Sequence, residues 1–154
     1  MTGKLRILLV LVTTFILGAC APFMVPLNEV DGEHMVNQQL TKEQVKEAIL
    51  EGAEHAGWRA KDVGDDKILA SFLFKTHAVN VEISYTGSDY LTQYKSSNEM
   101  KMFCLEQDKK THRNMVVSGR KDCPGNQPPK YIHKAYKQWV TSLDSSIQSS
   151  LSSM

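Results

Sequence analysis

Residues 77–85 read HAVNVEISY, and this stretch decides the fold. Apolar side chains stand at every second position from Val79 to Tyr85, with polar residues between them. Strict alternation of this kind is typical of a β-strand with one buried and one solvent-facing side. Three neighbouring stretches alternate in a similar way, and turn residues separate all four: 58–63, 68–75 and 90–95. The sequence therefore predicts a four-stranded antiparallel meander.

The turns between these stretches predict how the strands pair. A turn at 87–88 places Val81 opposite Tyr94, and a turn at 76–77 places Phe72 opposite Val81. With these pairings the apolar sets share one face of the sheet. The other face is expected to be open, with scattered leucines among its polar residues, which are Arg59, Ser71, Asn80, Glu82, Gln93 and Lys95.

Two amphipathic helices are predicted to cover the apolar face. The first begins at Thr41, which forms a capping-box pattern with Gln44, and it ends at Gly57. The second follows Pro128-Pro129, and one side of it is lined by Ile132, Tyr136, Val140, Leu143, Ile147 and Leu151. Two helices on one face of a half-buried sheet make an α+β domain of two layers.

The sequence predicts three parts in the chain. Residues 1–19 are read as a signal peptide, and residues 20–40, which have prolines and no periodicity, as a flexible tether. Residues 41–154 are expected to form a single α+β domain that carries an insertion at 104–123, bounded by two cysteines.

Composition excludes several classes of function. The net charge is only +1 over 154 residues, and there is no basic stripe with interleaved aromatic residues, so we expect no nucleic-acid partner. No histidine pair has a compact metal-ligand spacing, and His77 and His133 are expected to be capping or surface residues. We find no nucleophile elbow, phosphate-binding loop or C-x-x-C motif, so we expect no cofactor, no metal and no catalytic residue.

The N-terminus has the features of an export signal. Lys4 and Arg6 precede an apolar run at 7–17, which is too short for a membrane-spanning helix of about 20 residues. The run ends in Leu17-Gly18-Ala19-Cys20, which resembles the lipobox of bacterial lipoproteins. The resemblance implies that Cys20 receives a lipid and that a signal peptidase recognises residues 17–19 and cuts before the cysteine. Ala21 follows where an inner-membrane retention signal has aspartate, which implies an anchor in the outer membrane, facing the periplasm.

The rest of the chain resembles small uncharacterised lipoproteins of Gram-negative bacteria. The shared features are Gly57-Trp58, the alternating stretch at 77–85, the stretch at 90–94, and Tyr136 with Trp139. The resemblance implies a fold and an address in the envelope but no activity. This chain departs from that pattern at 104–127, where the cysteine-bounded segment is inserted.

The remaining two cysteines, Cys104 and Cys123, are predicted to form a disulfide. If Cys20 carries lipid, they are the thiols left over in an oxidising compartment. The polar and partly basic segment between them is expected to be a solvated loop. The alternative is a loop that contacts anionic partners such as lipid headgroups.

Two classes of function remain open. The first is a non-enzymatic structural or binding module of the envelope, held to the membrane by its lipid, with a protein partner that docks on the open sheet face at Ser71, Glu82 and Gln93. The alternative is a periplasmic enzyme, or a tethered enzyme inhibitor, whose site is assembled from residues distant in sequence.

Replacing Cys20 tests the predicted address. We expect Cys20→Ser to leave an unprocessed or soluble precursor that is insensitive to globomycin, because the thiol that accepts the lipid is gone. Processing is followed by gel mobility and partition by membrane fractionation. Unchanged processing and unchanged membrane partition of this variant would overturn the assignment.

Overall fold

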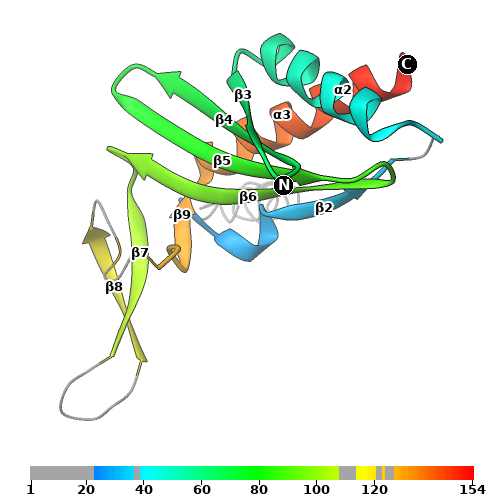
Figure 1. Ribbon diagram of the computed structural model, residues 1–154. Helices are drawn as coiled ribbons and strands as arrows, with labels where there is room; N and C mark the ends of the chain where they lie inside the picture. The colour runs from blue at the N-terminus through cyan, green and yellow to red at the C-terminus, as the bar shows by residue number, and fades with distance from the viewer. Residues whose placement is uncertain (1–22, 37–38, 108–113, 121–122, 124–126) are drawn as a thin grey trace, which may run out of the picture.

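The computed structural model describes residues 23–36, 39–107, 114–120, 123 and 127–154. In these residues two antiparallel sheets combine with two α-helices (Figure 1). The elements in chain order are β1 (Met24–Pro26), the 3₁₀ helix η1 (Leu27–Glu29), β2 (Gly32–Met35), α2 (Lys42–His55), β3 (Arg59–Gly64), β4 (Lys67–Phe74), β5 (His77–Tyr85), β6 (Asp89–Asn98), β7 (Met102–Gln107), β8 (Asn114–Arg120), β9 (Tyr131–His133) and α3 (Lys134–Ser152).

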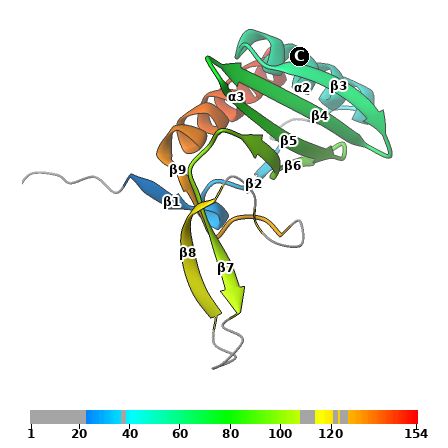
Figure 2. The same cartoon turned by 90° about the vertical axis from the view of Figure 1, so that its left-hand side faces the viewer.

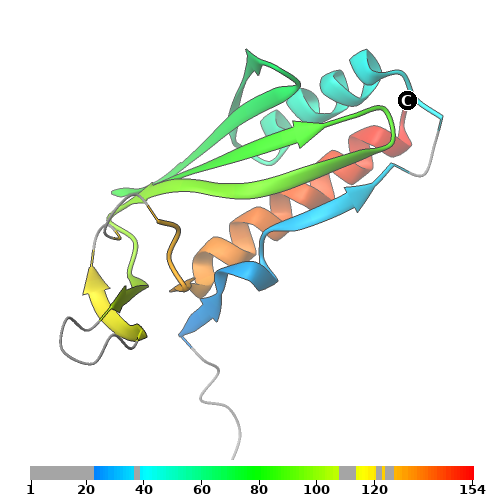
Figure 3. The same ribbon diagram turned by 60° about the horizontal axis from the view of Figure 1, so that its bottom comes forward.

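The larger sheet has five strands in the order β2-β6-β5-β4-β3. The predicted meander forms four adjacent strands of it, β3 to β6, and the predicted α+β class is confirmed. The predicted number of four strands is corrected, because β2 adds a fifth strand along β6, from Gly32 opposite Thr92 to Met35 opposite Asp89. Helices α2 and α3 pack side by side on one face of this sheet, and β2 lies alongside α3 (Figure 3).

The register of the meander agrees with the prediction at one hairpin and differs at another. Between β5 and β6, Val81 pairs with Tyr94, as predicted. Between β4 and β5, Phe72 pairs with Val79 and not with Val81, because the two turn residues are 75–76 and Lys75 adopts a left-handed φ of 56°. The shift is two residues along β5, so each side chain keeps its predicted face.

The segment predicted to be a flexible tether is folded onto the domain. Residues 24–26 pair with β9, and Leu27 is only 6% exposed in the main core. The N–H of Leu27 also donates to the carbonyl of Lys130 at 3.1 Å. The prediction of a tether over 20–40 is therefore corrected at residues 24–35, which form two strands and a 3₁₀ turn.

The insertion at 104–123 belongs to a second sheet, with the order β1-β9-β7-β8. Strands β7 and β8 pair from Met102 to Gln107 and form a hairpin that projects away from the larger sheet (Figure 2). The prediction of a solvated loop is corrected here, because paired strands are found. The predicted disulfide between Cys104 and Cys123 is confirmed, with 5.4 Å between the two Cα atoms.

The two helices approach each other closely at Gly52. The capping box of Thr41 and Gln44 starts α2 as predicted, and the buried side of this helix faces α3 and the sheet. A Cβ atom added at Gly52 would lie 2.5 Å from the Cα atom of Ile147 on α3. Only a glycine at this position lets the two backbones touch without moving the helices apart.

Substitution of Gly52 measures the value of this contact. Gly52→Ala gains helix propensity, but the added methyl overlaps backbone atoms, so we expect a net loss of about 1–2 kcal/mol in the free energy of unfolding. The measurement is urea unfolding followed by tryptophan fluorescence with the disulfide intact. The control is Glu51→Ala at the exposed neighbouring position. A Gly52→Ala variant more stable than the parent chain would show that the helices are free to separate.

Candidate functional site

The open face of the five-stranded sheet carries the three residues predicted to bind a partner. Glu82 on β5 lies directly opposite Gln93 on β6, and Ser71 on β4 lies opposite Asn80. All three point away from the helices, because their neighbours in each strand belong to the buried core. The structure therefore brings Ser71, Glu82 and Gln93 onto one surface.

Glu82 is the centre of a charged row on this face. Its carboxylate accepts from Nζ of Lys95 at 2.9 Å and from Nζ of Lys67 at 3.0 Å. These two lysines hold the pKa of Glu82 below its ordinary value, although partial burial opposes them. An irregularity in the β5–β6 register leaves Lys95 without an opposite residue. Glu82 is therefore a fixed negative group between two cations.

A second polar row crosses the same three strands. The hydroxyl of Ser71 donates to Oδ1 of Asn80 at 2.6 Å, and Nδ2 of Asn80 donates to the hydroxyl of Ser96 at 2.9 Å. Side chains held by such cross-strand contacts present their polar atoms in defined positions. The two rows give the open face a preorganised pattern of donors, acceptors and charges.

A wall along one side makes this face concave. Residues 27–28 of η1 and the segment 128–130 stand beside β6 and enclose a hollow of about 760 Å³ with Glu82, Gln93 and Lys95. A second hollow of about 610 Å³ continues along β6 toward Met102 and Cys123. Its lining mixes apolar and polar side chains, which suits a polypeptide surface better than a purely apolar ligand.

A second cluster of polar residues lies between β2, β6 and α3. Nε2 of His34 lies 3.3 Å from Oδ2 of Asp144, and the hydroxyl of Thr92 donates to Oδ1 of the same carboxylate at 2.9 Å. The ring of His34 stacks on Tyr90, with 4.8 Å between the ring centres. A hollow of about 430 Å³ opens beside His34 and Asp144.

Asp31 extends this cluster toward the wall of the open face. Its Oδ1 accepts from the N–H of Tyr94 at 3.1 Å and from the hydroxyl of Tyr136 at 3.2 Å. Burial raises the pKa of Asp31, and these two hydrogen bonds oppose the rise. Asp31, just before β2, and His34, within β2, thus fasten this part of the chain to the sheet and to α3.

Burial also raises the pKa of Asp144, and the nearby carboxylate of Asp31 adds to the rise. The imidazole of His34 and the hydroxyl of Thr92 act in the opposite direction, since both stabilise the ionised carboxylate. A buried carboxylate with its donors in place is a costly group to leave unpaired. The cluster therefore links the position of β2 to the charge on Asp144.

One signal for this cluster is present in the sequence, although no site was predicted there. Asp144 stands next to Leu143 and four residues after Val140, within the apolar side of α3, where a charge requires a buried partner. Its partner His34 and the neighbouring carboxylate Asp31 lie in a segment without periodicity. Nothing in their local sequence indicates that they are held against α3.

The remaining predicted residues fall in three groups. Cys20 and the recognition residues Leu17, Gly18 and Ala19 lie outside the described residues. His133 caps α3, with its Nδ1 accepting from the N–H of Ala135, and Nδ1 of His77 lies 2.7 Å from the carbonyl oxygen of Glu99. The expectation of capping or surface histidines is therefore confirmed.

No protein-family model matches the chain, and no significant match is found to a curated protein or to a solved structure. In the part of the chain that the structure describes, no helix combines the length and apolar character needed to cross a membrane. Among the same residues, no three His, Cys, Asp or Glu side chains are grouped to hold a metal ion.

The buried carboxylate predicts a specific dependence of stability on pH. The folded chain holds the proton of Asp144 more tightly than the unfolded chain, whose carboxyl has the ordinary pKa of 3.8. The free energy of unfolding therefore falls as pH rises through 3.8 toward the raised pKa. In the parent chain this fall amounts to about 1.4 kcal/mol for each unit by which the pKa is raised. Asparagine does not ionise and its side-chain oxygen still accepts from Thr92, so we expect the free energy of unfolding of Asp144→Asn not to show this fall.

The measurement is urea unfolding of the parent and Asp144→Asn chains as a function of pH. The matched control is Glu33→Gln, which removes an exposed carboxyl from the same region of the fold. A stability difference between parent and Asp144→Asn that stays constant with pH would show that burial does not raise the pKa of this group.

Proposed function

We propose that this protein is a lipoprotein of the Gram-negative outer membrane, anchored at Cys20 and facing the periplasm, that acts as a non-enzymatic binding module. Its partner is another envelope protein, which docks on the open sheet face. The observation that carries the binding role is the concave, uncovered face on which Ser71, Glu82 and Gln93 lie together beside the wall of η1.

The chemistry of this face supports a protein partner. Protein interfaces combine an apolar centre with a polar rim and satisfied hydrogen bonds. Here Leu69 and Leu91 are half-buried beside the polar side chains of this face, and Leu73 is exposed near the end of β4. A partner that supplies polar groups to Gln93 and covers these leucines would bury apolar area without leaving Glu82 unpaired.

With the proposed lipid anchor, weak binding would be sufficient for the partner to occupy the open face. A protein held at the membrane meets other anchored proteins at a high effective concentration, so modest contacts give substantial occupancy. The open face does not then need the large apolar patch that a freely diffusing protein would require for the same occupancy.

The alternative, a periplasmic enzyme or tethered inhibitor, is favoured by the pairing of His34 with Asp144. The orientation of the Thr92 hydroxyl, the third member of this cluster, argues against its being a nucleophile. In a nucleophilic site the hydroxyl donates its proton to the imidazole, whereas Thr92 donates to the carboxylate of Asp144. The arrangement suits a clamp that holds β2 in place, and we prefer the binding role.

Photocrosslinking in cells tests the docking face. We expect probes at Ser71, Glu82 and Gln93 to capture the partner, because the three positions point into the proposed interface. Probes at the exposed helix positions Glu47 and Lys137 serve as controls and should capture nothing specific. Crosslinked products are resolved by gel and identified by mass spectrometry. Capture from the helix positions alone, or only from the segment between Cys104 and Cys123, would refute this face.

A further inference from the structure

One end of the molecule combines exposed aromatic and basic side chains around the first described residue. Phe23 is 64% exposed, and its ring centre lies 5.0 Å from that of His133. Nζ of Lys134 lies over the Phe23 ring at 5.3 Å. Phe23 is thus held on the surface by a cation and an imidazole, and it is not part of the core.

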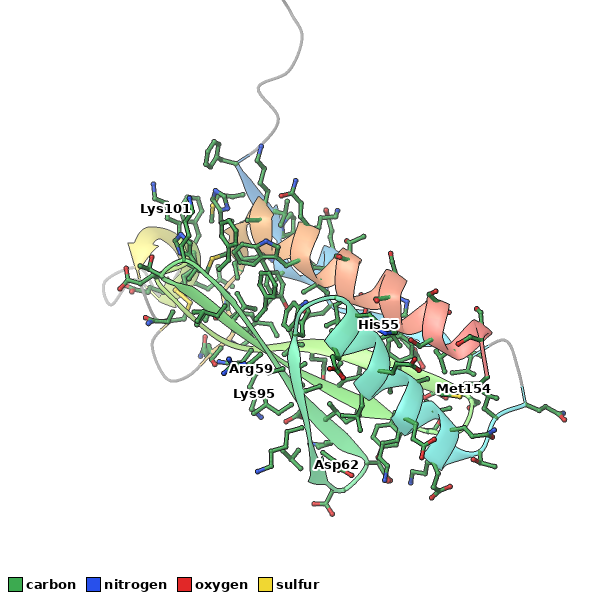
Figure 4. All side chains as sticks on the ribbon, turned by 90° about the horizontal axis from the view of Figure 1, so that it is seen from above. His55, Arg59, Asp62, Lys95, Lys101 and Met154 are labelled. Carbon is green, nitrogen blue, oxygen red and sulfur yellow. A yellow bond between two sulfur atoms is a disulfide. The ribbon has the colours of Figure 1, made fainter. Side chains whose placement is uncertain are left out.

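Backbone hydrogen bonds fix the neighbours of Phe23. The N–H of Lys134 donates to the carbonyl of Phe23 at 3.0 Å, and the N–H of His133 donates to the carbonyl of Lys101 at 3.1 Å. The exposed residue Lys101 therefore joins the same corner. Figure 4 shows Lys101 at the end of the molecule where β1 and α3 begin, with Asp62 and Met154 toward the other end.

The turn between β4 and β5 completes this end. Leu73 is 70% exposed and Phe74 is 47% exposed, and Nζ of Lys75 lies 5.5 Å from the centre of the Phe74 ring. The Phe74 ring lies 5.9 Å from that of Trp139, in the second turn of α3. We call this surface the basic end and define it as Phe23, Leu73, Phe74, Lys75, Lys101 and Lys134.

Among the described residues of the basic end, lysines outnumber acidic side chains. Glu99 is an acidic residue of the same corner, and it stands against three lysines. The pKa of His133 is lowered by burial first, and then by the charges of Lys134, Lys101 and His77. The first turn of α3 begins with Lys134 and holds no acidic residue, although a helix start favours anions. The helix dipole does not favour a lysine at this position, so the contacts of Lys134 lie outside its own helix.

The position of Cys20 limits where this end can lie. Three residues along an extended chain span at most about 11 Å, so a lipid on Cys20 keeps Phe23 within that distance of the anchor point. Because residues 24–35 are folded onto the domain, no longer tether separates the two. Any membrane that holds the anchor faces the surroundings of Phe23.

We propose that the basic end rests on the anionic headgroups of the membrane that holds the lipid anchor. Phe23, Leu73 and Phe74 enter the headgroup boundary, and Lys75, Lys101 and Lys134 contact phosphate groups. Aromatic and aliphatic side chains flanked by lysines are the composition that binds such interfaces. The inference rests on the proposed lipid at Cys20. It fixes the orientation of the domain and leaves the open sheet face accessible from the periplasm.

Lysine footprinting on vesicles tests the orientation. The lipidated protein is reconstituted into vesicles of phosphatidylcholine, with or without phosphatidylglycerol, and acetylated briefly before digestion and mass spectrometry. We expect phosphatidylglycerol to slow acetylation of Lys75, Lys101 and Lys134, and salt to reverse this protection. Lys42 and Lys61, which belong to other parts of the fold, should keep their rates.

A charge variant and its control separate headgroup binding from simple proximity. Lys101→Gln with Lys134→Gln should weaken docking by about 30-fold, read as lost protection of Lys75. Lys42→Gln with Lys61→Gln makes the same change in net charge and should leave that protection intact. Equal acetylation of Lys75, Lys101 and Lys134 in both kinds of vesicle would overturn the proposal, and so would protection that the first pair of substitutions does not reduce.

The same digest shows whether Cys20 carries lipid, so the two proposals fail separately. A lipidated N-terminal peptide without the footprint refutes the orientation and keeps the anchor. An unmodified Cys20 with the footprint refutes the anchor and keeps the basic end as a lipid-binding surface. An unmodified Cys20 without the footprint refutes both.

Discussion

The contact between backbones at Gly52 and Ile147 is the constraint on which the rest of the structure depends. Because the two helices touch there, they form one continuous layer and cover the apolar face of the sheet together. That layer buries the alternating residues of β5 on one side only. The other face stays available, and its polar rows are ordered by contacts across the strands. Close packing of the helices on one side of the sheet thus determines which side carries the polar rows.

Much of this architecture could be predicted, because it follows from periodic patterns in long elements. The alternation at 77–85 fixes which residues share a face, so the positions of Ser71, Glu82 and Gln93 on the open side follow even though one hairpin pairs two residues away from the predicted register. The capping box at Thr41 could be predicted because it is a motif of adjacent residues. The disulfide could be predicted from the number of cysteines. Strands of three or four residues show no period, and β1 and β2 find their partners at positions distant in the sequence.

The candidate site also has one part that the sequence pattern predicts and one part that it does not. The sheet side of the concave face was predictable, whereas its wall comes from residues 27–28 and 128–130, which are brought beside β6 only by tertiary structure. Asp144 was visible as a charge within an apolar helix side, but its partners His34 and Thr92 were not, since a buried polar contact leaves no local pattern in the sequence. The open face and the basic end share Leu73 and otherwise consist of different residues, so the proposed membrane contact and the proposed protein contact compete only at that side chain.

The pairing of β1 with β9 also sets an order of folding. Val25 pairs with Ile132, so the first strand of the described residues is completed by the last one, β9, which directly precedes α3. Closing so long a loop is slow, and it requires that both ends be present. Because synthesis proceeds from the N-terminus, residues 24–26 have no strand partner until residues 131–133 have been made. Residues 24–26 are therefore among the last of the described residues to gain their strand pairing, although they stand near the start of the chain.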